Sequence, residues 1–301
     1  MVLSLFWLVF LFISIIFFFV LVFFFVLIER KILGLSQSRV GPNKVSLFGL
    51  MQSLADFLKL IGNVNLFNGY ISFFNYRSFV YSLSLLLFFF TCFIFIFYFL
   101  NFNFLLLDNN IGLPWLIVFS SLGGYGVLLC GWGSQSKYSL YGGLRASFSS
   151  VTFEGALMCI ILLFGISNQG YSIDLLHIGL IWQGFFVYLF FFICLLCECQ
   201  RSPFDFSESE SDLVSGFNTD YYGISFALIF ASEYAIMIFF GWFISVLFFG
   251  FWFNIFFMFF HIYLLIFCRA CFPRIRYDYF VSIMWGVVII SLFILVSLSF
   301  V

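Results

Sequence analysis

Apolar runs of membrane-spanning length recur along the chain and constrain its fold more than any other feature. Only short polar stretches separate them. About 20 helical residues cross the roughly 30 Å hydrocarbon core of a bilayer. We therefore expect an all-α polytopic membrane protein, with eight transmembrane helices in a single membrane domain of residues 1–301. The predicted spans lie near residues 3–28, 73–100, 111–133, 147–166, 180–197, 221–245, 247–268 and 279–301.

Composition excludes an ordinary soluble domain. The chain is 64% hydrophobic and 8% charged, whereas soluble domains are about half apolar and a quarter charged. The first apolar run has no basic segment before it and no small-residue cleavage site, so we expect a retained span rather than a cleaved signal peptide.

The basic residues support the count of eight spans. Eleven of the 12 Lys and Arg fall between spans one and two, three and four, five and six, or seven and eight, and Arg77 lies near the start of span two, next to the first of these connections. With eight spans these four connections share one face of the membrane, which is the positive-inside pattern. Adding or removing one span within the chain would destroy this one-sidedness.

The first basic connection contains a second helical pattern. Over residues 48–61, apolar side chains such as Leu54 and Leu58 recur at three- and four-residue spacing, while Gln52 and Asp56 fall on the other face. This pattern predicts an amphipathic helix lying at the membrane interface. A simple packing helix remains the alternative.

Three acidic residues fall inside spans or at their ends: Glu154, Glu198 and Glu233. A carboxylate in hydrocarbon is costly, so each is expected to face the protein interior or a hydrated cavity. A structural carboxylate bonded to a neighbouring helix would look the same. Three such residues together favour a functional role in taking up and releasing protons.

Residues 198–220 form an acidic loop. Six of the protein's 13 acidic residues lie in it, against one basic residue, Arg201. Glu208, Glu210 and Asp212 alternate along the loop, and carboxylates this close titrate as a coupled set. A solvated acidic loop, the usual fate of a charge run, is the alternative.

Several patterns point away from metal and nucleotide chemistry. Cys194, Cys197 and Cys199, and likewise Cys268 and Cys271, have ligand-like spacing. Both groups stand at apolar span ends, however, where free cysteine is commonly a small buried hydrophobe, and we expect no metal. A lone histidine in an apolar span, at position 261, is expected to hydrogen bond between helices. No glycine-rich phosphate loop occurs, so we expect neither NAD nor flavin, and no nucleic acid.

A series of motifs in order along the chain resembles the subunit 1 family of NADH:ubiquinone oxidoreductase, respiratory complex I. The motifs are Glu29-Arg30-Lys31-Ile32-Leu33-Gly34, Arg39-Val40-Gly41-Pro42-Asn43, Gly49-Leu50-Met51-Gln52-Ser53-Leu54-Ala55-Asp56, Ser136-Lys137-Tyr138, Leu144-Arg145-Ala146, Arg201-x-Pro203-Phe204-Asp205, Glu208-x-Glu210-x-Asp212-Leu213-Val214-x-Gly216-Phe217-Asn218, Glu233-Tyr234 and Arg269-Ala270-x-x-Pro273-Arg274-x-Arg276-Tyr277-Asp278.

This resemblance implies a subunit at the junction of the membrane and peripheral arms, in the mitochondrial inner membrane with its basic loops on the matrix side. It implies that the chain forms much of the ubiquinone tunnel and couples quinone reduction to proton translocation. The chain would contribute no NADH site or redox centre of its own. Its partners would be the peripheral-arm quinone-site subunits, adjacent membrane-arm subunits, ubiquinone and phospholipids.

The resemblance also assigns roles to individual residues. The proton-coupling set it implies is Glu154, Glu198, Asp205, Glu208, Glu210, Asp212 and Glu233. The quinone-binding set it implies is Glu29, Arg30, Arg39, Gln52, Asp56, Phe217 and Arg274. The arginines are expected to orient the loops or to pair with the acids.

Two other functions fit the same residues. One is the homologous subunit of a membrane-bound hydrogenase, which lacks a quinone site. The other is an independent ion transporter, for which intramembrane acids are equally natural. Freestanding transporters often carry repeats or broken helices, and no internal repeat is visible here.

Overall fold

The computed structural model describes residues 2–62, 76–104, 112–134, 136–172, 184–207, 216–219, 221–249 and 254–299. Throughout these ranges the regular structure is helical, with no strand among them. The longer elements are α1 (Val2–Ser36), α2 (Gln52–Gly62), α3 (Tyr76–Phe104), α4 (Gly112–Gly133), α5 (Lys137–Ser167), α6 (Phe185–Glu198), α8 (Ile224–Phe249) and α9 (Asn254–Cys271). Shorter ones are the 3₁₀ turns η1 (Leu47–Gly49) and η4 (Gly216–Asn218), followed at the end by α10 (Tyr277–Ile283), the π-helical turn η5 (Met284–Val288) and α11 (Ile289–Ser299).

A helix lies over each predicted apolar run, and the all-helical class is confirmed for the described residues. Five of these helices are long and apolar enough to cross a membrane. They are Gly112–Gly133, Lys137–Ser167, Ile224–Phe249, Asn254–Cys271 and the continuous segment Tyr277–Ser299. The described part of α6 is shorter, at 14 residues. The count of eight spans stays a prediction.

Helix boundaries differ from the predicted spans where polar residues continue a helix. The fourth predicted span begins at residue 147, but α5 starts at Lys137. The Ser136 side chain caps it by accepting a hydrogen bond from the backbone N–H of Ser139. Likewise α1 runs through Glu29 to Ser36, because charged residues interrupt an apolar run without interrupting the backbone hydrogen bonds of a helix.

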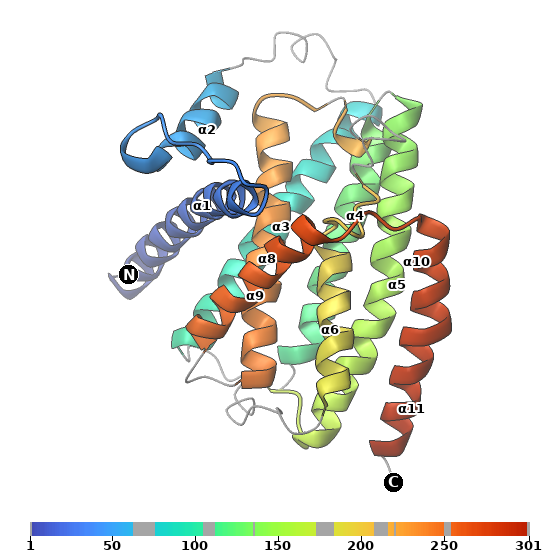
Figure 1. The fold of residues 1–301 in the computed structure, drawn as a ribbon. Coiled ribbons are helices and arrows are strands. Elements are labelled where there is room, and N and C mark those ends of the chain that lie inside the picture. The colour runs from blue at the N-terminus through green and yellow to red at the C-terminus, as the bar shows by residue number, and fades with distance from the viewer. Residues whose placement is uncertain are drawn as a thin grey trace.

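The helices form one bundle in which some members are slanted. In Figure 1, α4, α5, α6 and α8 run roughly along the long axis, while α1, α3 and α9 cross it at an angle and α2 lies beside α1. The core is strongly aromatic: Phe95 stacks on Phe239 with ring centroids 4.3 Å apart, and Phe191 and Phe243 are essentially inaccessible. The many phenylalanines thus fill the spaces between the helices as well as coating the outside.

Helices α4 and α5 come close enough for their backbones to touch. A methyl group on Gly131 would lie 2.9 Å from the carbonyl oxygen of Ser139 and 3.0 Å from the Cα of Gly143. No side chain larger than hydrogen fits between the two backbones there. Small residues commonly permit such close approach in membranes.

The helix predicted to lie at the membrane interface starts later than the sequence predicts. We expected it over residues 48–61, but α2 begins at Gln52, because Phe48 and Gly49 have positive φ angles of 58° and 75° and form η1. A Cβ on Gly49 would overlap the carbonyl of Pro42, so this turn requires glycine for both its space and its conformation.

Candidate functional site: a buried ion-pair cluster

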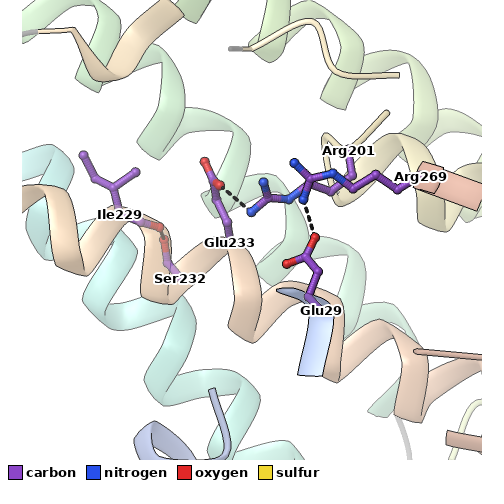
Figure 2. Close-up of polar contacts among 6 residues, drawn as sticks. All are labelled: Glu29, Arg201, Ile229, Ser232, Glu233 and Arg269. Atoms are coloured by element: carbon purple, nitrogen blue, oxygen red, sulfur yellow. Dashed lines mark hydrogen bonds and ion pairs between the residues drawn. The ribbon is translucent and has the colours of Figure 1, made fainter. Parts of the chain in front are cut away.

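Two ion pairs meet where α1, α8 and α9 come together with the segment after α6. The Nη2 atom of Arg201 lies 3.3 Å from Oε2 of Glu233, and Arg269 donates to Oε1 of Glu29. In Figure 2 the side chain of Arg201 points at Glu233 and that of Arg269 points at Glu29. The pairing expected between arginines and acids is therefore present in two places.

Three of these four charges are withdrawn from solvent. The side chains of Arg201 and Glu233 are 9% and 11% exposed and that of Glu29 is 5% exposed, whereas that of Arg269 is 32% exposed. Buried charges need partners, because desolvation costs several kcal/mol per ion and only close opposite charges offset it. Each arginine therefore offsets part of the desolvation cost of the acid that it pairs with.

Aromatic contacts complete the surroundings of Arg201. Its Cζ atom lies 4.8 Å from the ring centroid of Tyr234, the residue next to Glu233 on α8. Phe25 of α1 meets that ring edge-on at 5.5 Å. Ser232, the preceding residue, donates its hydroxyl to the carbonyl of Ile229 within α8, as Figure 2 shows.

The intramembrane acids converge on the same region from the bundle side. Glu198, at the end of α6, is 8% exposed and shares a cavity of about 20 Å³ with Glu233 and Ser150. A carboxylate oxygen of Glu154 lies 3.8 Å from the position that a methyl group on Gly124 would occupy, and Gly124 lines this cavity. The structure therefore brings together the three acids that the sequence singled out within its spans.

A third ion pair, which is exposed, joins α1 to α2. Nη1 of Arg30 donates to Oδ2 of Asp56 at 2.8 Å, and Gln52 donates to the other carboxylate oxygen at 3.0 Å. Phe57 also packs on Phe23, with ring centroids 4.7 Å apart. Three of the predicted quinone-site residues thus form one contact group.

The two ends of the acidic loop are held by different parts of the bundle. At its start, Arg274 donates to the backbone carbonyl of Asp205, and the backbone N–H of Ile275 donates to the carbonyl of Pro203 at 3.0 Å. Phe206 packs against Phe280 at 5.0 Å. The connection between α9 and α10 therefore fixes where the loop begins.

At the other end, Phe217 is fully buried and packs in a cluster of core residues from α3, α4, α5 and α8. Gly142 of α5 comes so close that a methyl group there would lie 2.9 Å from the backbone nitrogen of Phe217. Tyr221 donates its hydroxyl to the carbonyl of Cys130 at 3.0 Å and stacks on Tyr81 at 4.8 Å. Phe217 thus lies in the core, facing helices that carry the intramembrane acids.

Some predicted site residues lie elsewhere. Glu208, Glu210 and Asp212 fall outside the described residues. Arg39 is exposed and donates to the side chain of Gln37 at 3.0 Å, away from the ion-pair cluster. Its predicted role in quinone binding stays a prediction.

The cysteines and the histidine that the sequence analysis discussed lie in surroundings typical of packing residues. Cys194, Cys197 and Cys199 are buried free thiols. Within the described ranges, no three or more His, Cys, Asp or Glu residues group as a metal site would require. Nε2 of His261 lies 3.0 Å from the hydroxyl of Tyr188 on α6, which confirms the expected hydrogen bond between helices.

Sequence reasoning passed over two residues of this region. Tyr234 drew attention only as the neighbour of an acid, and Gly142 was not singled out. An aromatic residue beside an intramembrane acid, with arginines elsewhere in the chain, is a weak signal of a cation–π contact. Nothing in the sequence indicates that Gly142 would lie against the end of the acidic loop at Phe217.

Fold and site together define a class: a polytopic, all-helical membrane protein that buries acid–arginine pairs beside carboxylates from its helices. The family model described as NADH dehydrogenase matches residues 8–300, and the chain belongs to that family.

Relatives from three distant organisms carry names that agree with this family. NADH-ubiquinone oxidoreductase chain 1 of Myxine glutinosa is 40% identical over 272 residues, which cover 86% of this chain and 84% of the relative. The protein of that name from Arabidopsis thaliana is 36% identical over 280 residues, 86% of this chain and 85% of the relative. The one from Aedes aegypti is 35% identical over 270 residues, 86% of this chain and 83% of the relative.

Proposed function

We propose that this chain is a membrane-arm subunit of a proton-pumping NADH:ubiquinone oxidoreductase. In this role it forms much of the ubiquinone-binding tunnel and couples quinone reduction to proton translocation. The names of the relatives and their coverage of the chain support the placement. The partners are the peripheral-arm subunits that close the quinone site, the adjacent membrane-arm subunits and phospholipids. NADH and the redox centres belong to those other subunits.

The proposed topology has eight spans in the mitochondrial inner membrane, with the basic connections facing the matrix. The helices that lie over every predicted run support it. The proposed position of α2 is at the membrane interface. Its Leu58 and Ile61 are exposed, while Asp56 faces Arg30 of α1, which leaves an apolar face for lipid or for the isoprenoid tail of a quinone.

Ubiquinone is the proposed substrate, bound near the end of α1. Reduction of a quinone to a quinol adds electrons and protons, so nearby groups must supply protons or respond to new negative charge. Glu29, the Arg30–Asp56 pair and Gln52 would orient the headgroup or bear on its charge from this side. Their roles as quinone contacts are part of the proposal.

The observation that carries the proposal is the Arg201–Glu233 pair. Arg201 belongs to the acidic loop, whereas Glu233 belongs to a spanning helix and shares a cavity with Glu198. A charge change that shifts the loop would therefore alter the balance of charge at the intramembrane acids. This is a local electrostatic event with a distant readout.

The test uses the assembled complex carrying Glu233→Gln or Glu208→Gln. We expect quinone-linked turnover and the number of protons pumped per NADH to fall, while NADH oxidation by an artificial acceptor stays at the wild-type rate. Asp278→Asn is a matched control. Asp278 is also an acid, but its side chain is 83% exposed and lies 3.9 Å from that of Arg276, which is similarly exposed. Normal quinone turnover and pumping in both acid variants would refute the coupling role.

The alternative of an independent transporter has a simple discriminating measurement. Native-gel migration of the solubilised protein should show it in a large complex with NADH dehydrogenase activity. Migration as a small oligomer without that activity would favour a transporter instead.

A further inference from the structure

The guanidinium of Arg201 touches two consecutive residues of α8. It forms the ion pair with Glu233 at 3.3 Å, and its Cζ atom lies 4.8 Å from the ring centroid of Tyr234. Consecutive side chains diverge by about 100° around a helix with 3.6 residues per turn. Arg201 therefore lies across the surface of α8 and is held from two directions.

The ion-pair contact of Arg201 is longer than an ideal one. A close charge-assisted N–H···O contact measures about 2.7–2.9 Å, and the contact with Glu233 exceeds this range. Arg201 is only 7% exposed, and a cation over an aromatic face is most strongly attracted when both are desolvated. The ring of Tyr234 thus supplies attraction where water does not.

Arg201 also has a competing acid within the cluster. A cavity of about 10 Å³ is lined by Arg201, Arg269 and Glu29, so both guanidiniums border the same space as the carboxylate of Glu29. Moving Arg201 toward Glu29 would leave Glu233 without this arginine. Phe25, which lines the same cavity, braces the Tyr234 ring edge-on at 5.5 Å.

We infer that Tyr234 is a positioning residue whose ring face holds Arg201 on Glu233 and away from Glu29. The ring thereby keeps two separate ion pairs, one beside the α1–α2 contact and one beside the intramembrane acids. The functional consequence rests on the proposed function, in which the Arg201–Glu233 pair links the acidic loop to the spans.

The experiment compares Tyr234→Phe with Tyr234→Leu in the assembled complex. Phenylalanine keeps the aromatic face and removes only the hydroxyl, which hydrogen bonds to the Glu29 carboxylate. Quinone-linked turnover and the proton-to-electron ratio should therefore fall by no more than about twofold, the scale of one hydrogen bond. Leucine removes the face, and quinone-linked turnover should fall about tenfold, the scale of a desolvated cation–π contact. NADH oxidation by an artificial acceptor should not change in either variant. Equal losses in both variants would overturn the inference, because the hydroxyl would then be the important group.

A double-mutant cycle separates positioning from packing. In an Arg201→Gln background, no cation remains for the ring to hold, so Tyr234→Leu should cause little further loss of turnover. An additional tenfold loss there would mean that Tyr234 acts through the fold and not through Arg201. Tyr188→Leu is the control: it removes a half-buried aromatic side chain from α6, where Tyr188 contacts His261 and the ring of Phe248, and should leave the proton-to-electron ratio unchanged.

Two further points keep the outcome unambiguous. If the leucine variant does not assemble, Tyr234→Met offers an adaptable side chain without a ring and should show the same loss. If Glu233→Gln and Glu208→Gln both leave turnover and pumping normal, the proposed coupling role fails. If Glu233→Gln impairs them and the ringless variants do not, only the role of Tyr234 fails.

Discussion

Arg201 and Glu233 form a buried ion pair between the acidic loop and the spanning helix α8, with both side chains about nine-tenths withdrawn from solvent. The pair ties a polar connection to the interior of the bundle. Because its two charges neutralise one another where little water is present, removing only one of them should lower the stability of the protein.

Removing one charge from this pair should destabilise the protein more than removing both. Glu233→Leu would strand the Arg201 guanidinium at a cost of about 3–5 kcal/mol, whereas adding Arg201→Met should recover much of that loss. Thermal denaturation of the purified complex, followed as release of this subunit, would measure both. Strictly additive losses would show that the two side chains do not interact.

Gly143→Ala should loosen the contact between α4 and α5. Its Cβ would lie 2.9 Å from the Cα of Gly131, and overpacking of this kind costs about 1–3 kcal/mol. Gly286→Ala is the control, since a methyl group there meets nothing within 4 Å. The measurement is the midpoint of thermal inactivation, which should fall for Gly143→Ala alone.

Tyr221→Phe should weaken the anchor at the end of the acidic loop. The substitution keeps the ring that stacks on Tyr81 and removes the hydrogen bond to the carbonyl of Cys130, a loss of about 0.5–1.5 kcal/mol. Tyr222→Phe is its neighbour control, because Tyr222 is 41% exposed. A lower midpoint of thermal denaturation in the first variant only is the expected result.

Asp56→Asn should have little effect on stability and a larger effect on quinone use. Its pair with Arg30 is exposed, with side chains 40% and 49% accessible, and such pairs contribute about 0.2–1 kcal/mol. If Asp56 lines the quinone site, the KM for a short-chain ubiquinone should rise severalfold with an unchanged melting temperature. A lower melting temperature with normal KM would assign Asp56 a structural role instead.

Much of the fold could be predicted because a membrane imposes one rule on every span. Apolar length alone located the helices, and the one-sided basic residues suggested their order across the bilayer. The start of α2 escaped prediction because the turn at Gly49 depends on its close approach to Pro42, seven residues earlier. The α5 boundary escaped for a similar local reason, the cap at Ser136.

The candidate site was predicted as a set of residues but not as an arrangement. Acids in apolar surroundings are conspicuous in a sequence, so Glu198 and Glu233 could be found. Which arginine pairs with which acid depends on how α1, α8 and α9 pack, and Arg269 is 240 positions from Glu29. The contribution of Tyr234 depends on the direction of its ring, which no local pattern specifies.

The backbone contact at Gly131 and Gly143 has a mechanical consequence. Two helices separated by side chains can slide or rotate as those side chains change rotamer, but helices that touch backbone to backbone have no such bearing surface. The α4–α5 pair is therefore a rigid part of the bundle. Because α5 also carries Glu154 and abuts Phe217 through Gly142, we expect any movement of Arg201 to take place relative to this pair.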